Sequence, residues 1–587
     1  MIEARFDDLT GEAPSFRLTD PAGVLEAVRP EDVLPTLAAA EGAAARGLWV
    51  AGFVTYEAAP GLDPSLVVRP RPSDDPFSRL PLAWFAMFQQ RQETVLPSPR
   101  DEAPPSDAWV PTVDRTRYDM AIAKIREHIA AGDTYQVNHT LRLRSTVEGD
   151  ERGLYRDLCY AQRGAHAAYL NAGRYRILSA SPELFFRLDG DRLTTRPMKG
   201  TAPRGRWPAE DDATRERLTA SVKDRAENAM IVDLLRNDLG RIARPGTVRW
   251  AKVFEPERFE TVWQLTSTVT ADLQPGTGVP DVFGALFPSG SITGAPKVRT
   301  MGIIADLEDS PRGVYCGAVG FLAPANVGPP RASFNVAIRT VVVDAESGAA
   351  EYGVGGGITW DSSPAGEYDE TVAKARVLTA RRSPFELLES MRRDPGEPIR
   401  RLEQHVERLR DSATYFGYAF DEAAVRASMD TAGADADRPI RIRLRLSRVG
   451  AIEISWAALD RGAPEPVRLR LDDIPVDPDD VFLFHKTTLR GRYEDARARH
   501  PDADDAILIN TRGQVTETSV ANIAAELDGR WWTPPLDSGV LPGTERAALL
   551  VGGTLSERPI SIDEARTADG LAVFSSVRGW RSAVLLD

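Results

Sequence analysis

The pattern of hydrophobic and polar positions predicts a short strand at residues 192–195, where the two kinds of side chain alternate. We expect this strand to lie at the edge of a sheet. The proline and glycine of residues 197–200 should then turn the chain, so that the ammonium group of Lys199 projects from the strand end. Glu183 lies sixteen residues upstream of Lys199, across a predicted hairpin.

A lysine beside a carboxylic acid can displace a hydroxyl group. The amine attacks carbon while the acid protonates the leaving oxygen. An ordinary surface salt bridge would explain Lys199 and Glu183 equally well, so this pair alone does not identify a reaction.

Helical spacing of hydrophobic residues predicts two helices that carry carboxylate pairs. After Glu227, hydrophobic positions recur at intervals of three and four, which places Asp224 and Glu227 on one helix face. Glu367 and Glu370 repeat this arrangement on a second predicted helix. Such a pair is more often a solvated helix face, but two pairs together offer the oxygen ligands that Mg²⁺ prefers.

A second predicted strand, at residues 482–484, comes directly before His485 and Lys486, and a basic helical segment follows. This setting is typical of a lysine that forms a Schiff base, although a solvated lysine at a strand end is the commoner explanation of such a residue by itself. Glu517 follows a turn, and residues 539–546 form a loop that enters a helix, which suits a phosphate group.

The chain divides where a helical pattern that begins at residue 369 ends at residues 380–384. We therefore predict two domains, residues 1–382 and 383–587. The length of 587 residues agrees with this division, because single cores rarely grow beyond about 300 residues.

Composition narrows the class of protein. The net charge of −14 argues against nucleic acid as a partner. The chain has no hydrophobic run of about 18 residues or more and no signal-peptide pattern, so we expect a soluble, cytoplasmic protein that does not bind membranes. Cys159 and Cys316 are too few and too far apart for a disulfide framework or a zinc site, and we expect both in the core.

Eight motifs occur in the order found in one family of enzymes. Over roughly residues 50–380 the chain resembles the chorismate-utilising enzymes, and among them the aminodeoxychorismate synthases. The motifs are residues 52–57, 135–138, 180–183, 197–201, 227–238, 290–297, 335–340, and 355–357 with 367–371.

This resemblance implies an α+β fold of layered antiparallel sheets with outer helices, and chorismate and Mg²⁺ as ligands. By the same resemblance Glu227 and Glu370 match metal ligands, with Asp224 and Glu367 behind them. The implied substrate-binding residues are Arg339 and the backbone of Gly355 and Gly356 for the carboxylates, Thr293 and Gly294 as cavity lining, and Lys297 to offset negative charge.

Two positions indicate which reaction of the family to expect. Gln136 stands where isochorismate and salicylate synthases of the family have a lysine that activates water, and glutamine cannot act as that base. Lys199 stands where anthranilate synthases usually have alanine, so the resemblance implies a covalent lysine adduct and a later attack by ammonia without loss of pyruvate. Gln264 and Phe321 depart from the family pattern and could alter how the substrate lies.

The source of ammonia is expected to be a separate protein. No cysteine lies in a nucleophile setting with a matching histidine, so the chain has no recognisable glutaminase. A glutamine amidotransferase subunit is therefore implied as a partner.

Residues 383–587 resemble the fold-type IV pyridoxal-phosphate enzymes, in particular aminodeoxychorismate lyases and branched-chain aminotransferases. The resemblance implies that Lys486 binds pyridoxal 5′-phosphate covalently, that Glu517 pairs with the pyridine nitrogen, and that Arg408 binds the phosphate. Backbone donors near Val520, Ala521, Gly543 and Thr544 would complete the phosphate site. The domain lacks a full N-terminal stretch of the family, so either the first domain or a second protomer in a homodimer would complete the pocket.

Together the two resemblances imply synthesis of 4-amino-4-deoxychorismate followed by elimination of pyruvate to give 4-aminobenzoate, a folate precursor. One alternative is an anthranilate-type enzyme fused to an amino-acid aminotransferase of the branched-chain or D-amino-acid type. The other is that one half is catalytically silent and has a regulatory or scaffolding role.

Overall fold

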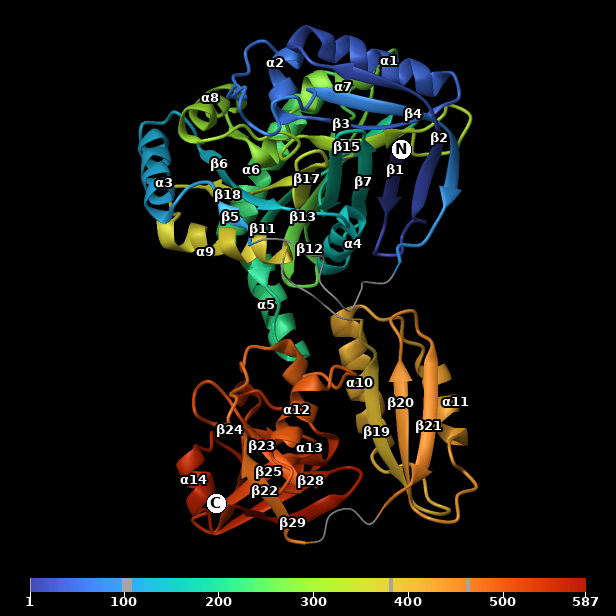
Figure 1. The fold of residues 1–587 in the computed structure, drawn as a ribbon, viewed down its shortest axis with the longest axis vertical. Coiled ribbons are helices and arrows are strands. Elements are labelled where there is room, and N and C mark those ends of the chain that lie inside the picture. The colour runs from blue at the N-terminus through green and yellow to red at the C-terminus, as the bar shows by residue number, and fades with distance from the viewer. Residues whose placement is uncertain (1, 98–107, 379–383, 461–464, 587) are drawn as a thin grey trace. The chain divides into compact units, whose positions relative to one another are not determined.

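The computed structural model describes residues 2–97, 108–378, 384–460 and 465–586 (Figure 1). Two compact units are present. Unit 1 comprises residues 1–204 and 215–383, and unit 2 comprises residues 205–214 and 384–587. The domain boundary predicted at residues 382 and 383 lies outside the described residues. Residues 205–214 belong to unit 2 although the sequence predicted them inside the first domain, so the chain passes between the units more than once.

Unit 1 is built on one large sheet whose paired strands are antiparallel throughout its described residues. The strands of this sheet are β1 (Glu3–Asp7), β2 (Phe16–Ala27), β3 (Trp49–Val54), β4 (Ala83–Glu93), β5 (Val110–Pro111), β6 (Gln136–Thr146), β7 (His166–Ala172), β8 (Tyr175–Ser181), β9 (Leu184–Asp189), β10 (Arg192–Arg196), β11 (Met198–Pro203), β12 (Arg249–Arg258), β13 (Val262–Asp272), β14 (Gly294–Ala295), β15 (Ala318–Leu322), β16 (Ala332–Val336), β17 (Thr340–Asp344) and β18 (Ala349–Ile358).

Helices cover this sheet on the outside, as the α+β class requires (Figure 1). They are α1 (Val33–Ala45), α2 (Ala59–Leu62), α3 (Arg115–Ala130), α4 (Glu151–Gln162), α6 (Val222–Gly240), α7 (Val279–Leu286), α8 (Lys297–Leu307) and α9 (Pro364–Ala375). Helix α5 (Pro208–Ala220) begins in unit 2 and ends in unit 1. The first turns of α6 and α9 are fixed by serine caps, because Ser221 accepts from the Asp224 N–H and Ser363 from the Gly366 N–H, each at 3.2 Å.

Strands β9, β10 and β11 carry the predicted lysine and carboxylic acid. The predicted hairpin is confirmed, since β9 and β10 are antiparallel neighbours and Leu184 pairs with Arg196. The prediction of an edge strand is wrong, because β10 lies between β9 and β13. The alternating pattern alone could not reveal the second neighbour, which comes from about seventy residues further along the chain.

Unit 2 contains two sheets. A three-stranded antiparallel sheet packs against α10 (Leu402–Phe416) and α11 (Glu422–Thr431), and its strands are β19 (Leu387–Arg393), β20 (Ile440–Leu446) and β21 (Ile452–Ala458). A mixed sheet has the order β24, β23, β22, β29, β28, β25, β26, β27. The bounds are β22 (Val467–Leu471), β23 (Asp505–Ile509), β24 (Val515–Thr518), β25 (Asn522–Leu527), β26 (Arg530–Thr533), β27 (Ser556–Glu557), β28 (Gly570–Ser575) and β29 (Gly579–Leu585), with helices α12 (Gly491–Arg499), α13 (Thr544–Val551) and α14 (Ile562–Thr567).

The local structure before Lys486 differs from the prediction. Residues Val481–Leu483 form a 3₁₀ turn, which Asp480 caps by accepting the Phe482 N–H at 2.9 Å, and no strand is assigned to the described residues 472–504. Short hydrophobic runs do not distinguish a strand from a buried turn. The helix predicted after Lys486 is confirmed as α12.

Both cysteines are buried and free, as expected: Cys159 and Cys316 lie in two different hydrophobic clusters of unit 1. Among the described residues, we find no helix with the length and apolar character that crossing a membrane would require.

Candidate active sites

A cavity of about 260 Å³ in unit 1 gathers most of the residues predicted for the chorismate site. These residues come from β11, α6, β18 and α9 and from the connections before β9 and β17. The predicted residues that line the cavity are Glu183, Lys199, Asp224, Glu227, Arg339, Gly355, Gly356, Glu367 and Glu370.

Lys199 reaches the cavity through a β-bulge. The register between β11 and β13 shifts between Met198 and Thr201, and Gly200 has φ +90°, which strongly favours glycine. A Cβ atom on Gly357 would lie 2.6 Å from Lys199 Nζ and 2.4 Å from Gln136 Nε2, so a larger residue here would displace the ends of these two side chains. The Gln136 amide is buried and makes no hydrogen bond within the described protein, which leaves its oxygen and nitrogen available beside the lysine.

The electrostatics of Lys199 and Glu183 suit a nucleophile and an acid. Burial lowers the pKa of Lys199, an effect that the nearby Glu227 partly opposes. Burial raises the pKa of Glu183 to about 7, although the Ser291 hydroxyl, which donates to Glu183 Oε1 at 2.6 Å, acts in the opposite direction. Glu183 is therefore able to hold a proton near neutral pH, and Lys199 loses its proton more easily than a solvated lysine does.

Four carboxylates face the other part of this cavity, in the helical pairs predicted from the sequence. Burial raises the pKa of Glu227 and of Glu367, and neighbouring carboxylates reinforce both shifts. Lys374, which the sequence analysis did not single out, lies 2.7 Å from Glu370 Oε1 and lowers the pKa of Glu370. Crowded oxygen donors of this kind fit a divalent cation chemically. In the described ranges, however, no three His, Cys, Asp or Glu side chains converge closely enough to hold a metal ion.

Three predicted residues do not line the cavity. Thr293 is fully buried and donates to Ser289 O at 3.0 Å, and Gly294 lies in β14, where a Cβ atom would lie 2.0 Å from Gln136 O. Lys297 binds Asp238 at 2.9 Å and Leu286 O at 3.1 Å. The same motif does reach the cavity through Ser291 and Ile292, whereas Thr293, Gly294 and Lys297 support neighbouring elements through these contacts.

The two departures from the family pattern have different surroundings. Gln264 lines the cavity, and its Nε2 lies 3.5 Å from Thr201 Oγ1. Phe321 packs among Phe6, Phe16 and Trp49 and does not line the cavity. Only Gln264 is therefore placed to affect a ligand directly.

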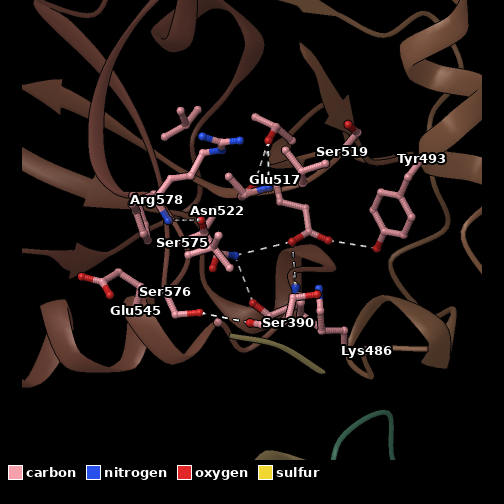
Figure 2. Close-up of a pocket in the computed structure, with 18 of the residues that line it drawn as sticks. Ser390, Lys486, Tyr493, Glu517, Ser519, Asn522, Glu545, Ser575, Ser576 and Arg578 are labelled. Atoms are coloured by element: carbon pink, nitrogen blue, oxygen red, sulfur yellow. Dashed lines mark hydrogen bonds between the residues drawn. The ribbon is translucent and has the colours of Figure 1, made fainter. Parts of the chain in front are cut away.

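Unit 2 contains a larger cavity, of about 670 Å³, shown in Figure 2. All residues predicted for the cofactor site line it, namely Arg408, Lys486, Glu517, Val520, Ala521, Gly543 and Thr544. A Cβ atom on Gly543 would lie 1.9 Å from Asn522 Oδ1, so a larger residue here would displace the Asn522 side chain. Thr544 begins α13, whose first N–H groups are available to an anion.

Lys486 and Glu517 have shifted pKa values in this cavity. Burial lowers the pKa of Lys486 to about 8, and the charges of Arg408 and Arg490 contribute to the decrease. Burial raises the pKa of Glu517 to about 7, against the effect of the Tyr493 hydroxyl, which donates to Glu517 Oε1 at 3.0 Å (Figure 2). Lys486 is also the only lysine in residues 384–587. Apart from histidines, the other basic residues of this stretch are all arginines. Arginine cannot release its proton at ordinary pH, so this position alone can supply a free amine.

A buried glutamate that the sequence analysis missed orients Arg408. Glu389 accepts from Arg408 Nε at 2.8 Å and from Arg408 Nη2 at 2.6 Å, and it lies 2.7 Å from His405 Nδ1. Burial alone would raise the pKa of Glu389, but Arg408 and His405 lower it to about 2. Arg408 Nη1 also donates to Pro542 O at 3.1 Å, so two of its five N–H groups remain for a ligand in the described structure.

The predicted backbone donors are only partly available. The Ala521 N–H donates to Thr518 Oγ1 at 3.1 Å, and the Gly543 N–H donates to Leu541 O at 2.8 Å. Sequence gives no signal for such internal bonds. Of the four positions, Val520 and Thr544 are therefore the stronger candidates for a phosphate contact.

Two arginines on the cavity-facing side of β20 were also missed. Arg441 and Arg443 alternate with the buried Ile440, Ile442 and Leu444, and both line the cavity. Neither has an ion-pair partner in the described part of the chain, whereas Arg445 on the same strand binds Glu386 at 3.2 Å. The alternation of charge along β20 was the signal available in the sequence.

The lowered pKa of Lys486 leads to a prediction about cofactor attachment. Only the unprotonated amine attacks an aldehyde, so covalent attachment of pyridoxal phosphate should accelerate as the pH rises through about 8 and then level off. Incorporation fixed by borohydride and measured from about pH 6 to about pH 10 would test this. A rate that continues to rise toward the usual lysine value of 10.5 would contradict it.

Two known protein families match different parts of the chain. Residues 10–380 match the chorismate binding enzyme family, and because this is more than half of the chain, the protein belongs to that family. Residues 386–585 match the class IV amino-transferases. The chain therefore joins a chorismate enzyme similar to aminodeoxychorismate synthases to a class IV aminotransferase-like domain.

Individual relatives match the first part of the chain. Aminodeoxychorismate synthase component 1 of Klebsiella aerogenes is 42% identical over 274 residues, which are 46% of this chain and 59% of that protein. Anthranilate synthase component 1 of Streptomyces coelicolor is 41% identical over 285 residues, 48% of this chain and 55% of that protein. The chain thus matches little more than half the length of these relatives.

A solved structure shows the same fold. Anthranilate synthase component I from Streptococcus pneumoniae aligns with a TM-score of 0.54 and 24% identity, over 63% of this chain and 93% of that one. At this identity the likeness concerns the fold alone.

Proposed function

We propose that unit 1 converts chorismate and ammonia to 4-amino-4-deoxychorismate and water, and that unit 2 converts this product to 4-aminobenzoate and pyruvate. One observation carries the proposal. Each unit has a cavity in which a lysine of lowered pKa lies with a buried glutamic acid whose pKa is raised to about 7. Two such pairs suit two reactions that each need an amine nucleophile and a proton donor or acceptor near neutral pH.

In the first reaction Lys199 is the nucleophile. Its amine bonds to a ring carbon of chorismate while Glu183 donates its proton to the departing hydroxyl, which leaves as water. Ammonia then bonds to the carbon that carried the hydroxyl, and the C–N bond to Lys199 breaks. Arg339 and Gly355 line the same cavity, and a guanidinium and backbone N–H groups suit the two carboxylates of the substrate.

Mg²⁺ would be held by Glu227 and Glu370, with Asp224 and Glu367 beside them. A bound cation would hold a substrate carboxylate and reduce the repulsion among these side chains. Lys374 would have to leave Glu370 for this, because the two are now paired at 2.7 Å. Ammonia would come from a partner glutamine amidotransferase, as the relatives named component 1 suggest.

In the second reaction Lys486 holds the cofactor and then transfers a proton from the carbon that bears the substrate amine. Pyridoxal phosphate, when bound, supplies an electron sink for that carbon. Glu517 holds a proton at the pyridine nitrogen, Arg408 and the start of α13 bind the phosphate, and Arg441 and Arg443 bind carboxylates of the dianionic substrate.

Analysis of products from the purified full chain would test this function. The reaction should contain chorismate, Mg²⁺, ammonium at alkaline pH and pyridoxal phosphate. Formation of 4-aminobenzoate and pyruvate in equal amounts is expected. Anthranilate, or the absence of any aromatic amine, would contradict the assignment of unit 1.

Replacing Glu183 with glutamine should slow formation of 4-amino-4-deoxychorismate by about 10²- to 10³-fold, because the leaving hydroxyl would lose its proton donor. Chorismate binding should change little, since glutamine has the same shape and can still accept from Ser291. Single-turnover rates at saturating chorismate would measure this. Glu257→Gln, a partly buried glutamate outside the cavity, is the matched control. An unchanged rate in Glu183→Gln would mean that another group is the acid.

A second candidate for unit 2 is an amino-acid aminotransferase, which the class IV match allows equally. Arg441 and Arg443, which have no ion-pair partner among the described residues, favour a substrate with more than one carboxylate. Arg443→Ala should therefore raise the KM for 4-amino-4-deoxychorismate by about tenfold, at the lower end of what hydrogen bonds to charged groups contribute, because this side chain is exposed. Arg445→Ala, on the same strand but outside the cavity lining, is the control. An unchanged KM together with transamination of a neutral amino acid would favour the aminotransferase.

A further inference from the structure

Residues 205–214 follow the strand that carries Lys199 and include the beginning of helix α5, yet they belong to unit 2. This segment has a tight internal structure. The Gly205 N–H donates to Asp211 Oδ1 at 2.9 Å, and the Asp211 N–H donates to Trp207 O at 2.9 Å. A Cβ atom on Gly205 would lie 2.2 Å from the Asp211 nitrogen, so the turn requires glycine. The segment therefore has one defined shape to present to its neighbours.

Its contacts within unit 2 converge on the residues that precede Lys486. The ring of Trp207 lies 5.1 Å from that of Phe484, and Arg206 binds Asp479 at 3.1 Å and donates weakly to Pro478 O at 3.5 Å. Rings at this separation attract each other beyond simple burial. Phe484 is almost fully buried, so Trp207 forms part of the wall that holds it.

A second path reaches His485 through α10. The Tyr415 hydroxyl donates to Gly205 O at 2.7 Å, and the Tyr415 ring lies 4.4 Å from the His485 ring. Ser412 Oγ lies 2.9 Å from His485 Nδ1 and fixes the other edge of this imidazole. Phe484 is thus held by Trp207 of the segment, and His485 is held by two residues of α10, one of which also binds the segment.

The chain after Lys486 is held separately. The Leu388 N–H of β19 donates to Lys486 O at 2.9 Å, and Thr487 forms an isolated bridge with Leu387. The position of the lysine along the cavity is therefore set by β19 on one side and by residues 205–214 with α10 on the other.

We propose that residues 205–214, which the family match assigns to the chorismate enzyme, are a positioning element of the unit 2 site: Trp207 and Gly205 fix Phe484 and His485 and so hold Lys486 where it meets its cofactor. This proposal rests on the function proposed for Lys486. A displacement of about 1 Å at a reacting group can reduce its reactivity by about 10²-fold, so packing at Trp207 can affect chemistry it does not touch.

The test uses the full-length protein without cofactor. Because Lys486 is the only lysine of unit 2, acylation of a side-chain amine there reports on Lys486 alone. Its acetic anhydride modification rate, measured by peptide mass spectrometry with Lys199 as internal reference, would be compared in Trp207→Ala, Trp207→Phe and Tyr415→Phe. Glu216→Ala, an exposed change further along α5, is the matched control. The Kd for pyridoxal phosphate would be measured on the same proteins.

Trp207→Ala should change the Lys486 rate and raise the Kd for pyridoxal phosphate by about tenfold. Lys199 should keep its modification rate. Trp207→Phe should have a Lys486 rate and a Kd for pyridoxal phosphate close to the wild-type values. Tyr415→Phe removes the hydrogen bond to Gly205 without altering the packing. If Trp207→Ala fails to fold, this variant tests the proposal in its place. Lowered thermal stability with an unchanged Lys486 rate and Kd would overturn the proposal.

The outcome separates the two proposals. If the wild-type protein does not bind pyridoxal phosphate at Lys486, the function proposed for unit 2 fails. The acylation rates require no cofactor, so they would still show whether Trp207 and Tyr415 position this lysine.

Discussion

Lys486→Ala should abolish 4-aminobenzoate formation while 4-amino-4-deoxychorismate accumulates. The lysine both anchors the cofactor and transfers the substrate proton, and a positioned proton-transfer group alone contributes about 10²- to 10⁴-fold. We therefore expect the second step to slow by at least about 10³-fold. Chromatography of products from chorismate and ammonium, with pyruvate measured in parallel, would show which step is lost.

Lys486→Arg distinguishes the amine from its charge. Arginine keeps a positive charge in the cavity but cannot release a proton, so this variant should be as inactive as Lys486→Ala. Formation of 4-amino-4-deoxychorismate must remain near the wild-type rate in both variants. Retention of 4-aminobenzoate formation in either one would show that Lys486 is not the catalytic lysine of unit 2.

Lys199→Ala should abolish the first step and leave the second intact. The variant should form 4-amino-4-deoxychorismate about 10³-fold more slowly or not at all, because ammonia would have no covalent adduct to displace. It should still convert added 4-amino-4-deoxychorismate to 4-aminobenzoate and pyruvate at the wild-type rate. Coupled and single-step assays on the same preparation would measure both.

The control for this variant is Lys252→Ala, a lysine of unit 1 that is 62% exposed and pairs with Glu255 outside the cavity. It should behave as wild type. If Lys199→Ala makes 4-amino-4-deoxychorismate at an undiminished rate, ammonia attacks chorismate directly and the lysine has only a structural or electrostatic role.

Local patterns predicted the elements that carry the chemistry. The hairpin before Lys199, the carboxylate pairs at the starts of α6 and α9, and the loop that enters α13 depend on spacing and on turn or cap residues close in sequence. The structure brings these distant elements to two cavities, which only the resemblance to known families could anticipate. When motifs follow the order of a known family, the topology of that family can be expected. The spacing of residues alone does not predict the topology.

Predictions that depended on tertiary partners were less successful. Lys297 lies in a predicted site motif, but Asp238 binds it outside the cavity. Strand β10 gained a second neighbour, and residues 205–214 joined unit 2, because contacts between distant segments outweigh position along the chain. Glu389 was missed for the same reason, since its role depends on the approach of α10 to β19.

The division of the chain into two units has a consequence for protein engineering. The chain passes between the units after residues 204, 214 and 383, so no single cut yields two complete halves. A fragment that begins at residue 384 would lack Trp207 and expose the face of Phe484. The fragment 1–383 would in turn carry Trp207 without Phe484 and Arg206 without Asp479 in the middle of its sequence. Exchange of either half for a homologous enzyme should therefore transfer residues 205–214 together with the C-terminal part.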